Sequence, residues 1–158
     1  MKRGFVVGVT GAAILVAGLA GCSSDKKQCV GDTCQSTGKA EATLTIDGKN
    51  QTVPQPVTCQ TGGQGGQIAM GNSGDPNNLM TAQFNATDVQ QMALLLDGKK
   101  LIVQNGNPMG GNATMKKDGN KYTFTGKAAE MGGTPDVSNP MNAMNPATHD
   151  FSLEVTCP

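Results

Sequence analysis

The residue types in this chain that most readily carry chemistry are its five cysteines and its single histidine, His149. The first cysteine, Cys22, ends a lipobox-like sequence, Leu19-Ala20-Gly21-Cys22, in which an aliphatic residue and two small residues precede the thiol. Small side chains fit a narrow protease cleft, and the thiol can accept a diacylglycerol group. The pattern therefore predicts cleavage before Cys22 and lipid attachment to its sulfur. The alternative is ordinary secretion with cleavage after Ala20 and an unmodified cysteine.

The segment before Cys22 has the layout of a secretory signal. Lys2 and Arg3 form a positive start, and the uncharged apolar run Phe5–Ala20 follows. This run is shorter than the roughly 20 apolar residues that a transmembrane helix needs. We therefore expect residues 1–21 to be a lipoprotein signal peptide that is removed, and we expect a lipid anchor in the cell membrane, on the extracytoplasmic face of the envelope.

The other four cysteines form an even set once Cys22 is acylated. An even number in an oxidising compartment indicates two disulfides, for which the sequence alone allows three connectivities. Cys29 and Cys34 are close in the chain, and Gly31-Asp32 can turn it between them, which favours a local pair. Cys59 and Cys157 would then join the start of the domain to its last strand.

The rest of the chain divides into a polar tether and a β-rich domain. Residues 22–40 are mostly polar and predict a flexible tether. Residues 41–158 contain short alternating segments separated by turn residues, which predicts a single small antiparallel sheet or sandwich-like domain. The hairpin around Asp118-Gly119-Asn120 is the clearest, and the segment after His149 predicts a half-buried final strand. The glycine-rich segment 61–67 is expected to be a loop.

One segment, Asp88–Leu96, fits two kinds of structure. Val89, Met92 and Leu96 recur at helical spacing, with Asp88 as a possible N-cap. The same residues could form a strand that turns at Asp97-Gly98 into the next strand. We favour the hairpin, so the domain is expected to hold at most one short helix.

Catalytic and metal-binding patterns are weak. His149 precedes Asp150, but adjacent side chains of a strand point to opposite faces, so the two are not expected to act as a catalytic pair. We expect His149 to be an exposed loop residue just before the last strand. Met141 and Met144 near His149 could form a Cu(I) site, because copper(I) prefers soft sulfur ligands. Met109, Met131, Met141 and Met144 could instead line a groove for an apolar ligand. The favoured reading is a protein without catalysis, cofactor or metal.

Composition argues against nucleic-acid binding. The whole chain has 12 Lys and Arg against 12 Asp and Glu, and Arg3, its only arginine, leaves with the signal peptide. Proteins that bind nucleic acid present a basic patch or stripe, and arginine is the preferred residue for phosphate.

Several motifs together resemble the mycobacterial LpqH lipoprotein antigens. They are "AAILVAGLAGCSS", "TIDGK", "VTCQT", "KKDGNKYTFTG" and the closing "LEVTC". The resemblance implies a surface-exposed envelope lipoprotein with a small β-rich domain and no enzymatic activity, acylated at Cys22. It also implies the Cys59–Cys157 disulfide, but it gives no support to Cys29–Cys34.

Two functions follow as expectations. In the first, the chain is an antigenic surface lipoprotein that acts through its anchor, and the resemblance implies detection by host Toll-like receptor 2. In the second, the β domain carries a lipid or another apolar ligand. A contiguous apolar cavity of several hundred Å³ would favour the carrier, whereas a filled core would favour the surface lipoprotein.

Overall fold

The computed structural model describes residues 27–30, 33–36, 39–132 and 146–158, with side chains from residue 39 onward. In these residues the chain forms strands, turns and irregular connections, and the strands join in a single antiparallel sheet. The strands are β1 (Lys27–Val30), β2 (Thr33–Ser36), β3 (Glu41–Ile46), β4 (Lys49–Gln51), β5 (Val57–Gly62), β6 (Gly65–Met70), β7 (Leu79–Asn85), β8 (Val89–Leu96), β9 (Lys99–Gln104), β10 (Asn112–Asp118), β11 (Lys121–Met131) and β12 (Thr148–Thr156). The predicted mainly-β antiparallel class is confirmed.

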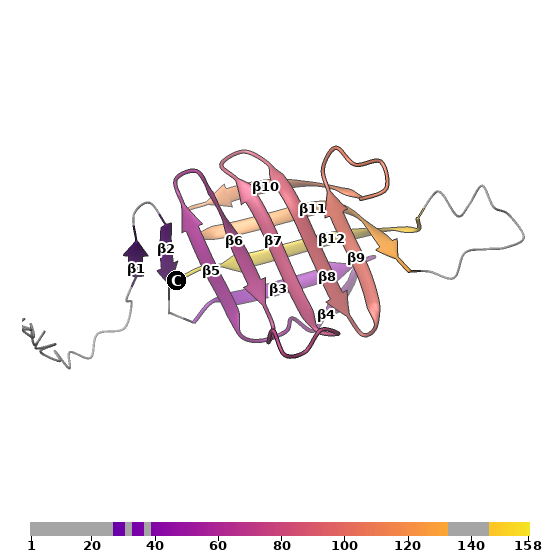
Figure 1. Cartoon of the computed structure of the whole chain (residues 1–158), viewed down its shortest axis with the longest axis horizontal. Coiled ribbons are helices and arrows are strands. Elements are labelled where there is room, and N and C mark those ends of the chain that lie inside the picture. Colours follow the sequence, from indigo (N-terminus) through magenta and orange to yellow (C-terminus); the bar gives the residue numbers. More distant parts are fainter. Residues whose placement is uncertain (1–26, 31–32, 37–38, 133–145) are drawn as a thin grey trace, which may run out of the picture.

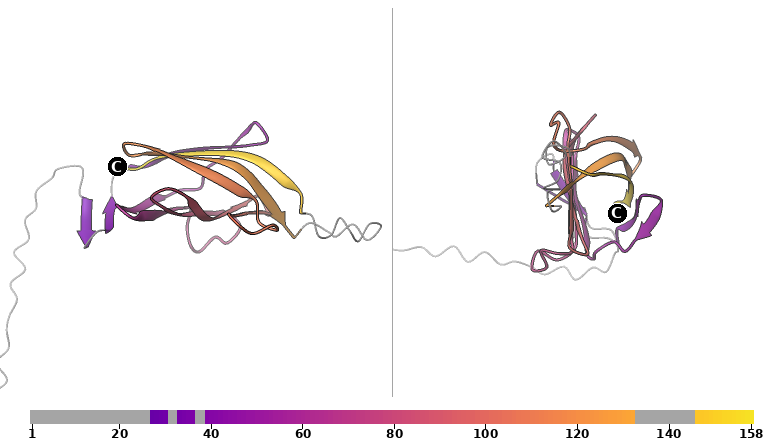
Figure 2. Two further views of the ribbon diagram at one scale, coloured as in Figure 1. Left: turned by 90° about the horizontal axis from the view of Figure 1, so that it is seen from above. Right: turned by 90° about the vertical axis from the view of Figure 1, so that its right-hand side faces the viewer.

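The sheet curls over so that two of its parts face each other. Strands β5 to β9 form one layer, and β10, β11, β12 and β3 form the other, crossing behind it at a large angle (Figure 1). Figure 2 shows the two layers edge-on. The long strand β11 makes the corner, because residues 121–127 pair with β10 and residues 129–131 pair with β9. This arrangement is the orthogonal kind of sheet packing.

The space between the layers is filled by side chains. Strand β12 shows the cause, since Phe151, Leu153 and Val155 alternate with polar residues and all three point inward. Phe84 from the first layer meets Phe124 and Tyr122 from the second, with ring centroids 5.5 and 5.2 Å away. The largest fully buried side chains are Phe124, Leu44, Ile68, Met70, Met80, Met92, Leu94, Leu101, Leu153, Val89, Val103 and Val155. A core packed in this way is typical of a folded interior.

The structure tests the predictions made for two segments of the chain. Residues 89–96 are strand β8, paired with β9 through the Asp97-Gly98 turn, so the hairpin reading is confirmed. The glycine-rich segment was wrongly expected to be a loop, because only Gly63 and Gln64 turn, and the glycines on either side are strand residues. This ladder position is occupied by glycine, Gly66, because a Cβ there would meet the Gln60 carbonyl oxygen at 2.6 Å. In the part of the chain that the structure describes, no helix has the length and apolarity to cross a membrane.

Candidate functional site

A buried disulfide joins the two layers at one end of the domain. Cys59 lies on β5, Cys157 follows β12, and their Cα atoms are 6.0 Å apart although 98 residues separate them in the chain. Cys59 is fully buried and Cys157 is 3% exposed. Cross-linking two sheet layers over so long a loop restricts the unfolded chain strongly, so this bridge is a main structural element of the domain.

The structure describes only part of the other predicted cysteine sites. Strands β1 and β2 pair so that Cys29 and Cys34 lie directly opposite each other in the ladder, and β2 in turn pairs with β5. Their side chains, and the whole region around Cys22, lie outside the described residues. The Cys29–Cys34 bridge and the acylation of Cys22 therefore stay predictions.

At the opposite end of the domain, His149 lies between two carboxylates. His149 belongs to β12 and its side chain is only 18% exposed, so the expectation of an exposed loop histidine was wrong. Its Nδ1 is 2.7 Å from Oδ2 of Asp47, and its Nε2 is 2.9 Å from Oε2 of Glu130. Because a carboxylate can only accept, the doubly protonated ring is the form that satisfies both contacts.

The carboxylates shift the titration of this ring. The hydrogen bond to Asp47, followed by that to Glu130, raises the pKa of His149 above its ordinary value of 6.5, while partial burial opposes the shift. The hydrogen bond to His149 lowers the pKa of Asp47 below 3.8. Both shifts favour the charged forms, a protonated His149 beside an ionised Asp47.

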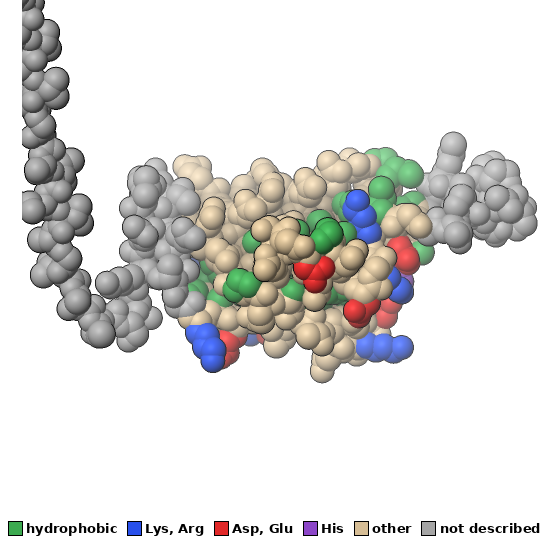
Figure 3. Space-filling view, turned by 60° about the horizontal axis from the view of Figure 1, so that its bottom comes forward, with side chains coloured by type: hydrophobic (Ala, Val, Ile, Leu, Met, Phe, Trp, Pro, Cys, Tyr) green, Lys and Arg blue, Asp and Glu red, His purple; other side chains and the backbone are tan. Residues whose placement is uncertain are grey.

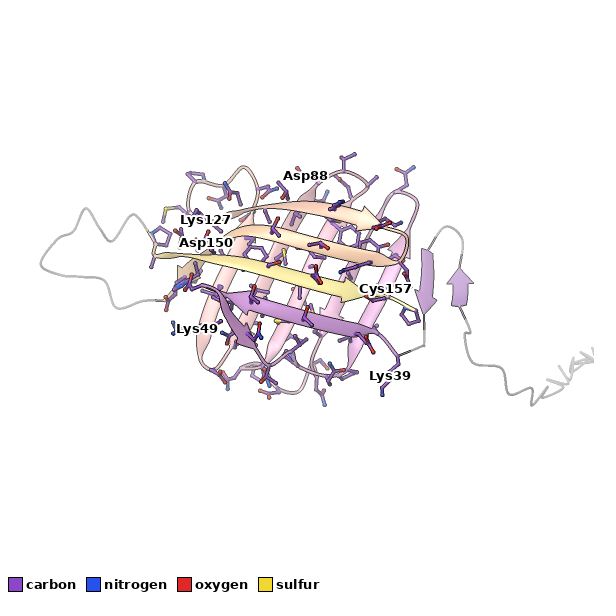
Figure 4. All side chains as sticks on the ribbon, turned by 180° about the vertical axis from the view of Figure 1, so that it is seen from behind. Lys39, Lys49, Asp88, Lys127, Asp150 and Cys157 are labelled. Carbon is purple, nitrogen blue, oxygen red and sulfur yellow. A yellow bond between two sulfur atoms is a disulfide. The ribbon has the colours of Figure 1, made fainter. Side chains whose placement is uncertain are left out.

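Backbone geometry places Asp47 for this role. Asp47 and Gly48 form the tight turn between β3 and β4 with φ values of 50° and 74°. The Asp47 amide donates to the Asp150 carbonyl oxygen at 2.8 Å, and the Asp150 amide donates back to Asp47 Oδ1 at 3.1 Å. The side chain of Asp150 turns the other way and pairs with Lys127 at 2.7 Å (Figure 4). The cluster thus fastens the β3–β4 turn to β12.

The site offers little to a metal ion. Both ring nitrogens of His149 already face carboxylates, and within the described residues no group of three or more His, Cys, Asp or Glu side chains could hold a metal. A groove of about 240 Å³ beside His149 is lined by Ile46, Asp47, Lys49, Gln51, Leu96, Asp97, Lys99 and Leu101. Met109 and Met131 are 46% and 44% exposed, whereas Met141 and Met144 lie outside the described residues.

Sequence reasoning missed Asp47 and Glu130 as partners of His149. Asp47 is 102 residues away in the chain and Glu130 is 19 residues away. Asp47 stood out locally only as part of an Asp-Gly turn, and no local pattern shows which distant strand such a turn will face. The register of β12 with β3 brings Asp47 to His149, and its register with β11 brings Glu130.

The fold and the disulfide define the class of this protein as a small disulfide-linked all-β domain. A family model described as Mycobacterium 19 kDa lipoprotein antigen matches residues 35–157. Lipoprotein LpqH of Mycobacterium tuberculosis H37Rv is 37% identical over 166 residues, covering 99% of both chains. Lipoprotein LpqH of Mycobacterium avium is 30% identical and a putative lipoprotein of Mycobacteroides abscessus is 32% identical, each over 99% of both chains.

The chain belongs to the Mycobacterium 19 kDa lipoprotein antigen family, as the resemblance predicted. This is a family of lipoprotein antigens and not a family of enzymes.

Proposed function

We propose that the chain is a cell-envelope lipoprotein, held at the extracytoplasmic membrane face through acylated Cys22, whose lipidated N-terminus is what host receptors detect. The observation that carries this proposal is the sequence Leu19-Ala20-Gly21-Cys22 behind an apolar signal-like run, in a chain of the lipoprotein antigen family. The thiol accepts the lipid, and the residues after it connect the anchor to the domain.

The geometry of the domain agrees with attachment at one end. Lys39, where the continuous described domain begins, lies at the same end as Cys157, whereas Lys127 and Asp150 lie at the other end (Figure 4). A chain that enters at Lys39 leaves the His149 end pointing away from the point of attachment. The two layers between these ends are joined by the Cys59–Cys157 bridge. The domain would therefore move as one unit at the end of its tether.

The small amount of exposed aromatic surface on the domain supports recognition through the lipid. All four aromatic residues of the domain, Phe84, Tyr122, Phe124 and Phe151, are buried. Arginine is absent after residue 3, so the residue types that dominate protein interface hot spots are scarce on the described surface. Acyl chains contribute about 0.8 kcal/mol per buried CH₂. We therefore assign recognition by Toll-like receptor 2 to the acylated N-terminus.

The carrier alternative finds less support in the fold. The interior between the layers is filled by Leu, Met, Val and Phe side chains. An apolar ligand would have to lie outside the core. Met109 and Met131 are the exposed large hydrophobic residues of the described surface, and neither lines the open groove of about 490 Å³ beside β10 and β11.

The test separates anchor from domain. Wild-type chain, the Cys22→Ser variant and a synthetic acylated peptide of residues 22–27 are compared on cells that carry Toll-like receptor 2. We expect the wild type and the peptide to signal, and the variant to be silent and either released to the medium or held as the uncleaved precursor. Equal potency of the unlipidated variant would contradict the proposal, as would its retention in the membrane after signal removal.

A further inference from the structure

Five glutamines form a straight row across the outer face of the β5–β9 layer. In the pairing of adjacent strands, Gln60 lies opposite Gln67, Gln67 opposite Gln83, Gln83 opposite Gln91, and Gln91 opposite Gln104. All five side chains are exposed, and the inward neighbours of each are core residues. We call these five residues the glutamine row. Adjacent amides are spaced by the distance between strands, about 4.8 Å.

The face that carries the glutamine row is almost free of charge. Strands β5, β6, β7 and β8 contain no Asp, Glu, Lys, Arg or His, although their outer face is open to solvent. A surface designed for solubility usually carries about 25–35% charged residues. In the first layer the charged strand residues are Lys99 and Lys100 at the start of β9, whereas the other layer carries the ion pairs Lys121–Glu154 and Lys127–Asp150. In Figure 3 most charged side chains lie along the lower edge and at the right-hand end.

Short side chains lie beside the glutamine row. The next outward-facing ladder runs Thr58, Ala69, Thr81, Ala93 and Ile102, and all five are half-buried. The side chains of this ladder are mostly short, uncharged and mostly apolar. On the other flank, a groove of about 460 Å³ is lined by Gln60, Gly62, Gln64, Gly65, Gly66, Gln67, Phe84, Asn85 and Gln90. Its volume is within the range of small-molecule sites.

The chemistry of this face selects among ligands. Each amide offers two donors and an acceptor, which matches a hydroxyl that both donates and accepts. Strands β5–β8 carry no cation that could pair with phosphate or anionic lipid, and the lysines of β9, Lys99 and Lys100, lie at the opposite end of that strand from Gln104. Without exposed Trp, Tyr or Arg, it lacks the usual anchors of a protein interface. The mostly apolar ladder can contact the C–H faces of sugar rings.

We propose that the outer face of β5–β9 binds a neutral, hydroxyl-rich glycan that lies across the strands along the glutamine row. The hydroxyls of the chain would meet successive amides, and the groove beside Gln60 and Gln67 would take one end. This binding activity belongs to the folded domain and does not depend on the lipid anchor. It would give the folded domain a contact of its own with the envelope, separate from the lipid anchor.

The test uses the mature chain in detergent, measured against immobilised linear glucan, mannan and galactan oligosaccharides and against heparin. One variant carries Gln67→Thr, Gln83→Thr and Gln91→Thr, which keeps strand propensity and removes three amides. A matched control carries Thr114→Ala and Lys116→Ala on the exposed face of β10. Thermal melting checks that both variants fold, and sedimentation reports their oligomeric state.

We expect at least one neutral glycan to bind, with affinity unchanged by added salt. The glutamine variant should lose at least about 10-fold in affinity, since three hydrogen bonds are removed, while the β10 control stays at the wild-type level. The proposal fails if no neutral glycan binds at millimolar concentration, or if binding is confined to heparin and falls with salt. It also fails if the folded glutamine variant binds normally, or if the row proves to mediate self-association.

Discussion

Removing the Cys59–Cys157 bridge should lower the stability of the domain more than any other two-residue change of similar size. The bridge closes a loop across 98 residues. The chain-entropy relation gives about 4.7 kcal/mol for a loop of that length, and native bridges in small secreted domains contribute about 2–5 kcal/mol. We therefore expect Cys59→Ala with Cys157→Ala to lower the free energy of unfolding by about 2–5 kcal/mol. Both sulfurs are buried, so lost packing adds to the effect.

The assay is urea unfolding followed by circular dichroism, with the Cys29→Ala, Cys34→Ala double variant as the matched control. Residues 29–34 close a loop of only a few residues on the edge strands β1 and β2, so the same relation gives roughly 2 kcal/mol at most for that pair. The melting temperature of the first variant should fall by about 2–8 °C for each kcal/mol lost. A loss below about 1 kcal/mol, or equal losses in both variants, would refute the reasoning.

Three further outcomes are expected. Because the pKa of His149 is raised in the fold, the stability that the ring contributes is present below pH 6.5 and is lost as the pH rises through the folded pKa. The melting temperature of the wild type should therefore fall as the pH rises through the folded pKa, and that of His149→Gln should fall less. Equal pH profiles would contradict the charge-paired contact. Gly126→Ala should destabilise the domain by about 1–3 kcal/mol in the same unfolding assay, because the added Cβ would meet Ala113 Cα of β10 at 2.7 Å. The control Gly63→Ala should be nearly neutral, because its added Cβ would have nothing within 4 Å. The chain should not bind Cu(I) tightly in a chelator competition; tight binding that Met141→Leu abolishes would replace the structural reading with a copper site.

Much of the fold could be predicted from short-range patterns. The alternation of Phe151, Leu153 and Val155 identified β12, and the Asp118-Gly119-Asn120 turn identified the β10–β11 hairpin. These features depend on residues within one strand or one turn, where side-chain periodicity is a direct consequence of backbone geometry. The family was also within reach, because its motifs occur along most of the chain.

What could not be predicted depends on register between distant strands. The pairing of β3 with β12 puts Asp47 beside His149, which local pattern had placed in an exposed loop. The glutamine row has the same origin, because each of its members is an ordinary polar residue in its own strand. Only the pairing of five strands lines them up. The glycines around Gly66 were misjudged because a crowded ladder, and not a loop, requires them.

The central claim is that Cys22 is the acylated first residue of the mature chain. Intact mass spectrometry of the protein from the membrane fraction tests it most directly, with a peptide map to locate any added mass. The account predicts a chain that begins at Cys22 and carries the mass of acyl groups on that residue, with Cys59 and Cys157 oxidised. A mature chain that begins at Gly21, or that carries an unmodified Cys22, would contradict it.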